Sequence, residues 1–209
     1  KDAAQRLDAL EARLRERSDW DQLVDLYLGR AGIEATATQR GQLLRKLGDL
    51  LALHAPRLGE IERRDNGKLA IEVTPQIRYL ADYVHYYAGL ADKVQSEVIP
   101  SDKQGVFAYT KHEAKGVVAI ITPWNSPLAL TTWKLAPALA AGCTVVVKPS
   151  EYTSASMVEF AKLFAEAGFP SGVVNVVTGF GQEVGEPLVT HPQVAHVGFT
   201  GGEGSVAFE

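Results

Sequence analysis

Residues 116–150 read GVVAIITPWNSPLALTTWKLAPALAAGCTVVVKPS, and this stretch decides the fold. Its two short continuous apolar runs, at 117–121 and 145–147, are typical of strands that are buried on both faces. Between them a helical pattern runs from Pro127 to Ala141 and ends at Gly142. A strand, a crossover helix and a second strand predict a parallel βαβ unit.

The same alternation continues toward the C-terminus. Apolar runs recur at 173–177 and, more loosely, at 194–199. One helical pattern follows a Thr153/Ser154 cap, and a shorter, weaker one lies near 182–190. Together these runs predict an α/β fold with a Rossmann-like parallel sheet, in which ligands bind at the carboxyl ends of the strands.

The residues before this region are mostly helical by pattern. One or two amphipathic helices are predicted within 3–28, a second within about 38–54 that stops near Pro56, and a third within about 75–90. We therefore expect a helical N-terminal part packed on the sheet.

Composition excludes several classes of function. The 209 residues are 46% hydrophobic, and a net charge of -4 gives no reason to expect a nucleic-acid or anionic-membrane partner. No apolar run approaches the ~20 residues that span a bilayer. Cys143 is the single cysteine, so an intramolecular disulfide or a structural zinc site is excluded, and the histidines lack metal-ligand spacing. We expect a cytoplasmic protein without a metal site.

The first strand leads into a turn that holds a polar residue between two prolines. Pro123 and Pro127 stiffen the backbone on both sides of Asn125. A fixed amide donor at the carboxyl end of a strand can stabilise a developing oxyanion. The alternative is that Asn125 caps the following helix, and spacing alone favours this second interpretation.

The second strand ends in Lys148, Pro149, Ser150 and Glu151. A lysine and a carboxylate three residues apart can hold the two hydroxyls of a ribose, and the carboxylate would repel a 2'-phosphate, which favours NAD over NADP. A surface ion pair of no functional consequence is an equally good interpretation of the spacing.

The later strands are followed by glycine-rich segments. Residues 178–185 (TGFGQEVG) let backbone approach a ring or phosphate closely, although their spacing departs from that of an ordinary dinucleotide site. Residues 198–202 (GFTGG) are small enough to open a helix that faces a pyrophosphate, or they form a plain glycine turn. Cys143 is interpreted as a buried structural thiol, not a nucleophile, and His112 beside Glu113 as a solvated loop pair.

In order and spacing, the motifs resemble the N-terminal, cofactor-binding half of the NAD(P)-dependent aldehyde dehydrogenases. The resemblance covers about residues 36–202. Its distinctive pieces are ITPWN at 121–125, WKLAPALAAG at 133–142, KPSE at 148–151, GFP at 168–170, GVVN at 172–175 and FTG at 199–201. It implies an α/β, aldehyde dehydrogenase-like fold that is incomplete in this chain.

The resemblance also implies a role for each matching residue. Asn125 would be the oxyanion donor, Lys134 would support it, and Ser126 in place of a bulky aromatic would give a wider or more polar substrate tunnel. The residues implied to bind cofactor are Ile121, Thr122, Pro123 and Trp124 near nicotinamide, Lys148, Ser150 and Glu151 near the adenosine ribose, Gly181 and Gln182 near adenine, and Gly201 and Gly202 near pyrophosphate. Leu130 and Trp133 would face the tunnel.

The family oxidises an aldehyde to a carboxylic acid through a cysteine thiohemiacetal, and the nucleophile of that mechanism is absent from the residues given. We expect two parts: residues 1–35, of unclear role, and residues 36–209, an NAD-binding domain that is truncated or lacks residues near 205/206. In the second case Glu209 would be the general base; otherwise it is a chance ending. The partners implied are a small-molecule aldehyde and further copies of the chain. The alternative function is an inactive fragment that binds nucleotide or assembles with another chain.

Overall fold

The computed structural model describes residues 36–202. Four parallel strands form the central sheet in the order β5-β4-β3-β6. Their bounds are Val117–Ile121 for β3, Thr144–Lys148 for β4, Val174–Val176 for β5 and Val194–Phe199 for β6. The chain moves outward from β3 to β5 and then returns to the other side of β3. This reversal between β3 and β6 is the place where open α/β sheets bind ligands.

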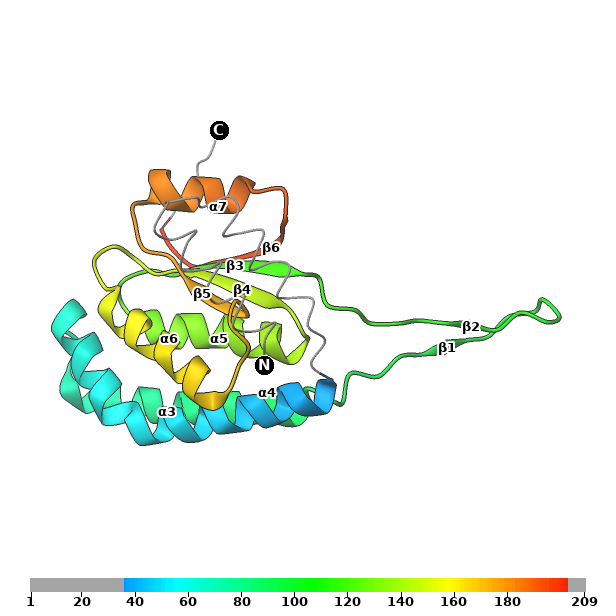
Figure 1. Ribbon diagram of the computed structural model, residues 1–209, viewed down its shortest axis with the longest axis horizontal. Helices are drawn as coiled ribbons and strands as arrows, with labels where there is room; N and C mark the ends of the chain where they lie inside the picture. The colour runs from blue at the N-terminus through cyan, green and yellow to red at the C-terminus, as the bar shows by residue number, and fades with distance from the viewer. Residues whose placement is uncertain (1–35, 203–209) are drawn as a thin grey trace, which may run out of the picture.

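Helices cover both faces of the sheet (Figure 1). One face carries α5 and α6, with α3 and α4 packed beneath them, and the opposite face carries α7. The helix bounds are Ala37–Asn66 for α3, Ala70–Leu90 for α4, Pro127–Ala140 for α5, Ala155–Ala167 for α6 and Glu186–Thr190 for α7, which continues from the π-helical turn η1, Gly181–Gly185. The predicted α/β fold with a helical N-terminal part is confirmed.

The core is the apolar face that the helices bury against the sheet. Ile120, Val145 and Val147 of the sheet are fully buried, as are Leu128 of α5 and Phe160 of α6. On α3 and α4 the buried residues recur at spacings of three or four, which is the pattern that predicted these helices. Gly168 ends α6 in the left-handed conformation (φ +92°), as expected of a glycine after a helix.

Two helix boundaries were predicted wrongly. The helix expected to stop near Pro56 runs on to Asn66, because Leu58, Gly59 and Glu62 continue the buried stripe past the proline. Packing of that stripe offsets the hydrogen bond that Pro56 removes. The helix expected from Pro75 begins at Ala70 instead. The helices predicted within 3–28 lie outside the described residues.

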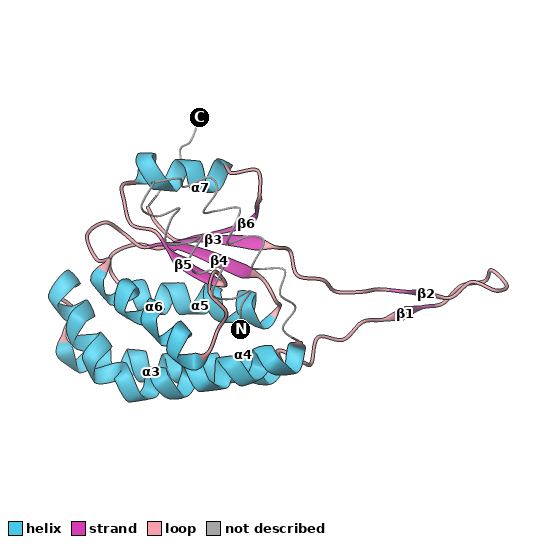
Figure 2. Ribbon diagram, in the orientation of Figure 1, coloured by secondary structure: helices cyan, strands magenta, loops and turns pink. Residues whose placement is uncertain are grey.

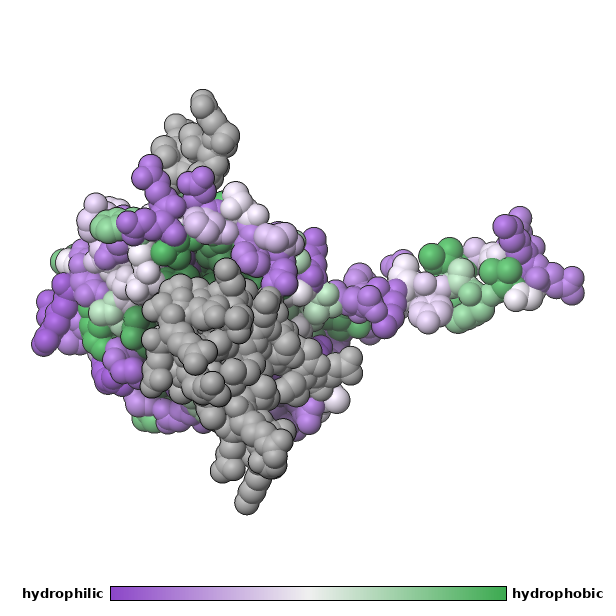
Figure 3. All heavy atoms as spheres, turned by 45° about the horizontal axis from the view of Figure 1, so that its top comes forward, coloured by the Kyte–Doolittle hydropathy of each residue, from purple (hydrophilic) through white to green (hydrophobic). Residues whose placement is uncertain are grey.

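A projecting hairpin was missed from the sequence. Strands β1 (Val98–Ile99) and β2 (Ala108–Tyr109) pair antiparallel and form an arm that stands away from the body (Figure 2). Apolar side chains line the arm (Figure 3), and Val98, Phe107 and Tyr109 are 65%, 73% and 61% exposed. Two-residue strands carry too little alternation to be read as a pattern. Between residues 36 and 202, none of the helices combines the length and apolarity needed to cross a bilayer.

Candidate functional site

The carboxyl ends of three neighbouring strands meet at one edge of the sheet. Ile121 at the end of β3 is opposite Lys148 of β4 on one side and Phe199 of β6 on the other. Backbone bonds continue this pairing beyond the strands, from Thr122 N to Lys148 O (3.2 Å) and from Thr200 N to Ile121 O (3.0 Å). The residues predicted to act on cofactor and substrate therefore begin side by side.

The turn from β3 to α5 presents Asn125 at this edge. The residue at the N-cap of α5 is Ser126, and Pro127 occupies the first helical turn, where proline is well accommodated. The interpretation of Asn125 as the helix cap is therefore wrong, because Asn125 lies one residue outside the cap position. Its side chain is exposed, whereas Thr122 at the start of the turn is buried and its hydroxyl lies 3.3 Å from that of Thr131.

Residues at the end of α3 and just after it form hydrogen bonds to this turn. Asn66 Nδ2 donates to the carbonyl oxygens of Trp124 (3.3 Å) and Asn125 (3.2 Å). Lys68 Nζ donates to Ser126 Oγ at 2.7 Å, and fully buried Glu62 accepts from Leu128 N at 3.3 Å.

Burial raises the pKa of the Glu62 carboxyl, although nearby Lys68 and the Leu128 N–H act in the opposite direction. Sequence analysis missed these contacts to the turn. The one local signal was that Glu62 falls four residues after Leu58 on the buried stripe, where a charge is unusual.

Lys148 and Glu151 form the second feature of the edge. The Lys148 side chain is only 4% exposed and that of Glu151 is 31% exposed, with Nζ and Oε2 3.7 Å apart. Lys148 Nζ also donates to Pro149 O at 3.2 Å. The buried ammonium thus lies next to a partly solvated carboxylate. This arrangement suits a diol, whose hydroxyl oxygens can accept from the ammonium and whose O–H groups can donate to the carboxylate.

The glycine-rich segments adjoin these residues. A Cβ added to Gly185 of η1 would lie 3.7 Å from Lys148 Cδ, so this turn packs on the lysine stem. Gly179, with φ +153°, leaves no room for a side chain, since a Cβ would lie 2.4 Å from Val184 Cγ2. A Cβ at Gly201 would lie equally close to the Phe199 ring, whereas Gly181 and Gly202 face open space. The segment η1 is a single π-helical turn, and such turns are frequent at functional sites.

Lys134 bridges α5 to the end of β6. Its Nζ donates to Thr200 Oγ1 at 2.6 Å and to Leu130 O at 3.0 Å, and desolvation lowers its pKa. These bonds place the ammonium at the point between β3 and β6 where the sheet order reverses. The contacts are to Thr200 and Leu130, so the structure records no direct support of the Asn125 side chain by Lys134.

Comparison with known proteins gives the family. The family model described as the aldehyde dehydrogenase family matches residues 33–206. This chain belongs to the aldehyde dehydrogenase family. It is 58% identical over 167 residues to the (Z)-2-((N-methylformamido)methylene)-5-hydroxybutyrolactone dehydrogenase of Acinetobacter baylyi, covering 80% of this chain and 34% of that protein. It is 40% identical over 201 residues to retinaldehyde dehydrogenase 3 of Rattus norvegicus, covering 96% and 37%.

The fold agrees with the family assignment. An aldehyde dehydrogenase of Bacillus cereus, solved as an NAD+ complex, matches with a TM-score of 0.80 and 41% identity over 86% of this chain and 38% of that one. The resemblance predicted from the motifs is thus confirmed. The chain spans about a third of the length of the curated relatives it matches.

The residues expected to face a substrate tunnel in an aldehyde dehydrogenase lie on α5. Leu130 is half-buried, and Trp133 is 42% exposed with its carbonyl oxygen accepting from Tyr83 Oη at 3.2 Å. Trp124, expected near nicotinamide, is 55% exposed. Their roles stay predictions.

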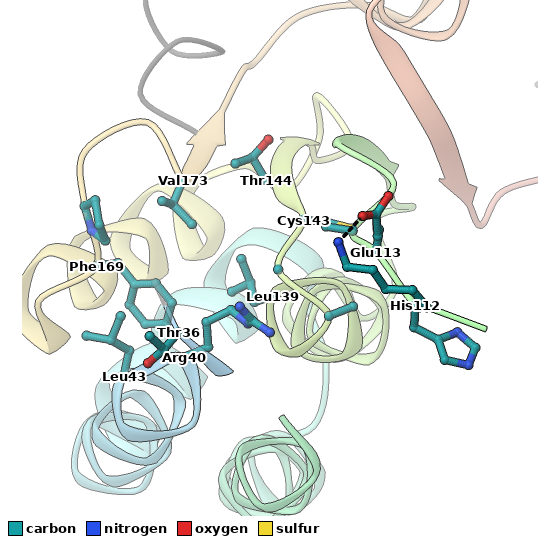
Figure 4. A pocket seen from close by; sticks show the side chains of 15 residues that line it. Thr36, Arg40, Leu43, His112, Glu113, Leu139, Cys143, Thr144, Phe169 and Val173 are labelled. Atoms are coloured by element: carbon teal, nitrogen blue, oxygen red, sulfur yellow. Dashed lines mark hydrogen bonds and ion pairs between the residues drawn. The ribbon is translucent and has the colours of Figure 1, made fainter. Parts of the chain in front are cut away.

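Cys143 is far from the carboxyl ends of the strands. It precedes β4 and is buried, as predicted, whereas Asn125 follows the carboxyl end of β3, and the two strands are parallel. Cys143 lines a cavity of about 550 Å³ at the opposite edge of the sheet, together with Arg40 and Leu139 (Figure 4). The cavity is therefore separate from the site of the predicted chemistry.

A charged loop, residues 111–115, lies beside the cavity. Glu113 bonds to Lys111 Nζ, which lowers the pKa of its carboxyl, and Glu113 and His112 both border the cavity (Figure 4). Both His112 and Glu113 are exposed in a loop, as predicted, and the partner of Glu113 is Lys111. The division at residue 35/36, the break near 205/206 and the role of Glu209 fall on or next to residues outside the described range, 36–202.

Proposed function

We propose that this chain is the cofactor-binding part of an NAD-dependent aldehyde dehydrogenase that oxidises an aldehyde to a carboxylic acid. The observation that carries the proposal is the adjacency, on neighbouring strands, of the fixed Asn125 turn and the Lys148–Glu151 pair at the carboxyl edge of the sheet. The names of the relatives, which are dehydrogenases of aldehydes and related compounds, support the same reaction class.

The residues at the edge fit NAD. Lys148 and Glu151 would hold the adenosine ribose, with Ser150 beside them, and Gly181 and Gln182 would leave adenine an open surface. Gly201 and Gly202 would lie along the pyrophosphate, and Ile121, Thr122, Pro123 and Trp124 would border nicotinamide. Bound NAD supplies the acceptor for the substrate hydride. The Glu151 carboxylate favours NAD over NADP because it would repel a 2'-phosphate.

Asn125 would act on the substrate oxygen. A cysteine thiolate attacks the aldehyde carbon to form a thiohemiacetal, and the carbonyl oxygen then carries the negative charge. The Asn125 amide would donate a hydrogen bond to this oxyanion. Hydride leaves the carbon, a thioester remains, and water releases the acid and the free thiol. Cys143 is buried at the opposite edge, so we propose that the attacking thiol lies outside this sequence.

Leu130 and Trp133 would border the aldehyde on α5, and Ser126 would leave a wider or more polar tunnel than an aromatic residue. We propose a homo-oligomer, and its support is the apolar hairpin arm, with Phe107 73% exposed. Apolar side chains gathered on a projection are the kind of surface that assembly buries.

Two measurements test the proposal. The chain alone should bind NADH, seen as a change in NADH fluorescence, and Lys148→Met should weaken this binding. A full-length enzyme that carries the segment should reduce NAD+ at 340 nm with an aldehyde, and Asn125→Ala should lower kcat by about 10²- to 10³-fold. Binding without turnover in the full-length enzyme would favour the alternative, a nucleotide-binding or assembly module. If the chain does not bind NADH and the full-length enzyme does not turn over, the proposal is contradicted.

A further inference from the structure

The amide of Asn66 fixes the backbone on both sides of Asn125. Its Nδ2 donates to the carbonyl oxygens of residues 124 and 125, which belong to the two peptide groups that flank the Asn125 α-carbon. The orientation of this amide is itself set, because Oδ1 accepts from Lys68 N at 3.0 Å. Gly67 between them adopts φ +73°, which lets the chain turn back at the end of α3.

Lys68 holds the next residue of the turn. Its Nζ donates to Ser126 Oγ at 2.7 Å and to Gln76 Oε1 on α4, and its side chain is only 15% exposed. The ammonium also lies 3.6 Å from Glu62 Oε1. One lysine thus connects the turn to two helices.

Glu62 anchors the arrangement. It is fully buried, and Oε2 accepts from Leu128 N in the first turn of α5, a backbone donor that the helix itself cannot satisfy. Separating a buried carboxylate from its ammonium would leave an uncompensated charge, so the pair resists rearrangement. The structure gives Glu62 Oε1 no hydrogen bond among the described residues, and the ion pair with Lys68 is its compensation.

These contacts constrain residues 124, 125, 126 and 128, which leaves the Asn125 side-chain torsions as the main freedom at this point. An amide donor stabilises an oxyanion only at the right position, and a displacement of roughly 1 Å can cost about 10²-fold in rate. Resting on the proposed function, we propose that Asn66 and Lys68, anchored on Glu62, are positioning residues that aim the Asn125 amide at the substrate oxygen.

The first test measures the turn in the chain itself by hydrogen exchange. Asn66→Ala and Lys68→Met should speed exchange of the backbone amides of residues 124–126 and 128, while exchange in the sheet stays unchanged. Lys162→Met is the matched control, because Lys162 pairs with Glu159 on the surface of α6 and does not touch the turn. Unchanged exchange at residues 124–126 and 128 in both variants would overturn the proposal without bearing on NADH binding.

The second test measures kcat and KM in a full-length enzyme that carries the segment. Asn66→Ala and Lys68→Met should lower kcat about 10- to 100-fold with a smaller change in the KM for NAD+, because the adenosine ribose would be held by Lys148 and Glu151. Lys68→Arg keeps the charge and the donor, and should retain most of the rate. Adding Asn66→Ala to Asn125→Ala should cause no further loss, since Asn66 acts through Asn125.

The outcomes separate the two proposals. If Asn125→Ala leaves kcat intact, the oxyanion role fails, whatever the other variants do. If Asn125→Ala lowers kcat while Asn66→Ala and Lys68→Met do not, the positioning role is overturned. Additive losses in the double variant would overturn it as well. If Asn66→Ala does not fold, Lys68→Met and Ser126→Ala, which removes the acceptor of Lys68, give the same comparison.

Discussion

Replacing Glu151 by glutamine should weaken discrimination between NAD and NADP. The carboxylate lies 3.7 Å from Lys148 Nζ, and its side chain is 31% exposed, so its field is partly screened by water. A unit negative charge about 6 Å from the Glu151 carboxylate would be repelled by roughly 0.7 kcal/mol in water and by about 2.8 kcal/mol at an effective dielectric constant of about 20. A 2'-phosphate carries about -1.5 to -2 charges. With screening taken into account, about 1 to 2 kcal/mol of repulsion remains.

This energy corresponds to about a 5- to 30-fold change in relative affinity. Titrating the chain with NADH and with NADPH, followed by fluorescence, gives the ratio of the two Kd values. In Glu151→Gln the ratio of the NADPH Kd to the NADH Kd should fall by that factor. Glu166→Gln removes an exposed carboxylate from α6 and is the control. If both coenzymes bind Glu151→Gln with the wild-type ratio, the carboxylate does not face the 2'-position and the assignment is refuted.

Three further predictions concern stability. Gly179→Ala should lower the free energy of unfolding in urea by about 1 to 3 kcal/mol and weaken NADH binding, because Gly179 has a positive φ and an added Cβ would clash. Gly181→Ala is the control: its Cβ would enter open space, so stability should stay near that of the wild type. Phe160→Ala should cost about 3 to 5 kcal/mol, because the ring is fully buried, and Val158→Ala on the exposed face of α6 should cost far less; equal losses would contradict the packing. The raised pKa of Glu62 means that the folded state keeps its proton to higher pH than the unfolded state, so wild-type stability falls relative to Glu62→Gln as pH rises above about 4.5. Urea unfolding at pH 4 and pH 7 checks the sign, and a relative gain by the wild type at pH 7 would disprove it.

The strands were predictable because their signal is local. The run 117–121 is apolar over its whole length, and 194–199 is apolar apart from His196 and Gly198; they form β3 and β6 with the predicted bounds. The helix past Pro56 was not predictable from local rules, since the proline argues for a stop and only tertiary packing of Leu58 and Glu62 argues against it. Tertiary contacts prevailed over local propensity at that point.

The site residues also fall into those that the sequence predicts and those that it does not. Asn125, Lys148 and Glu151 stand next to strand ends, so parallel topology alone predicts that they share an edge. Asn66 and Lys68 come from a helix end without any sequence link to the turn they bind, and only the folded structure brings them there. The pairing of Glu113 with Lys111 was missed because side-chain reach, not adjacency, selects the partner.

The bond between Asn66 and the Asn125 carbonyl joins residues 59 positions apart, which has a consequence for the order of folding. Helices α3 and α4 follow each other directly and can pair early, whereas closing the longer loop costs more chain entropy. We therefore expect the turn after β3 to acquire its shape only when the sheet layer docks on that helical pair. In a gradual denaturant titration, NADH binding should be lost before the helical circular-dichroism signal. The reason is that the site forms where the sheet layer contacts α3 and α4, so it opens as soon as these two layers separate.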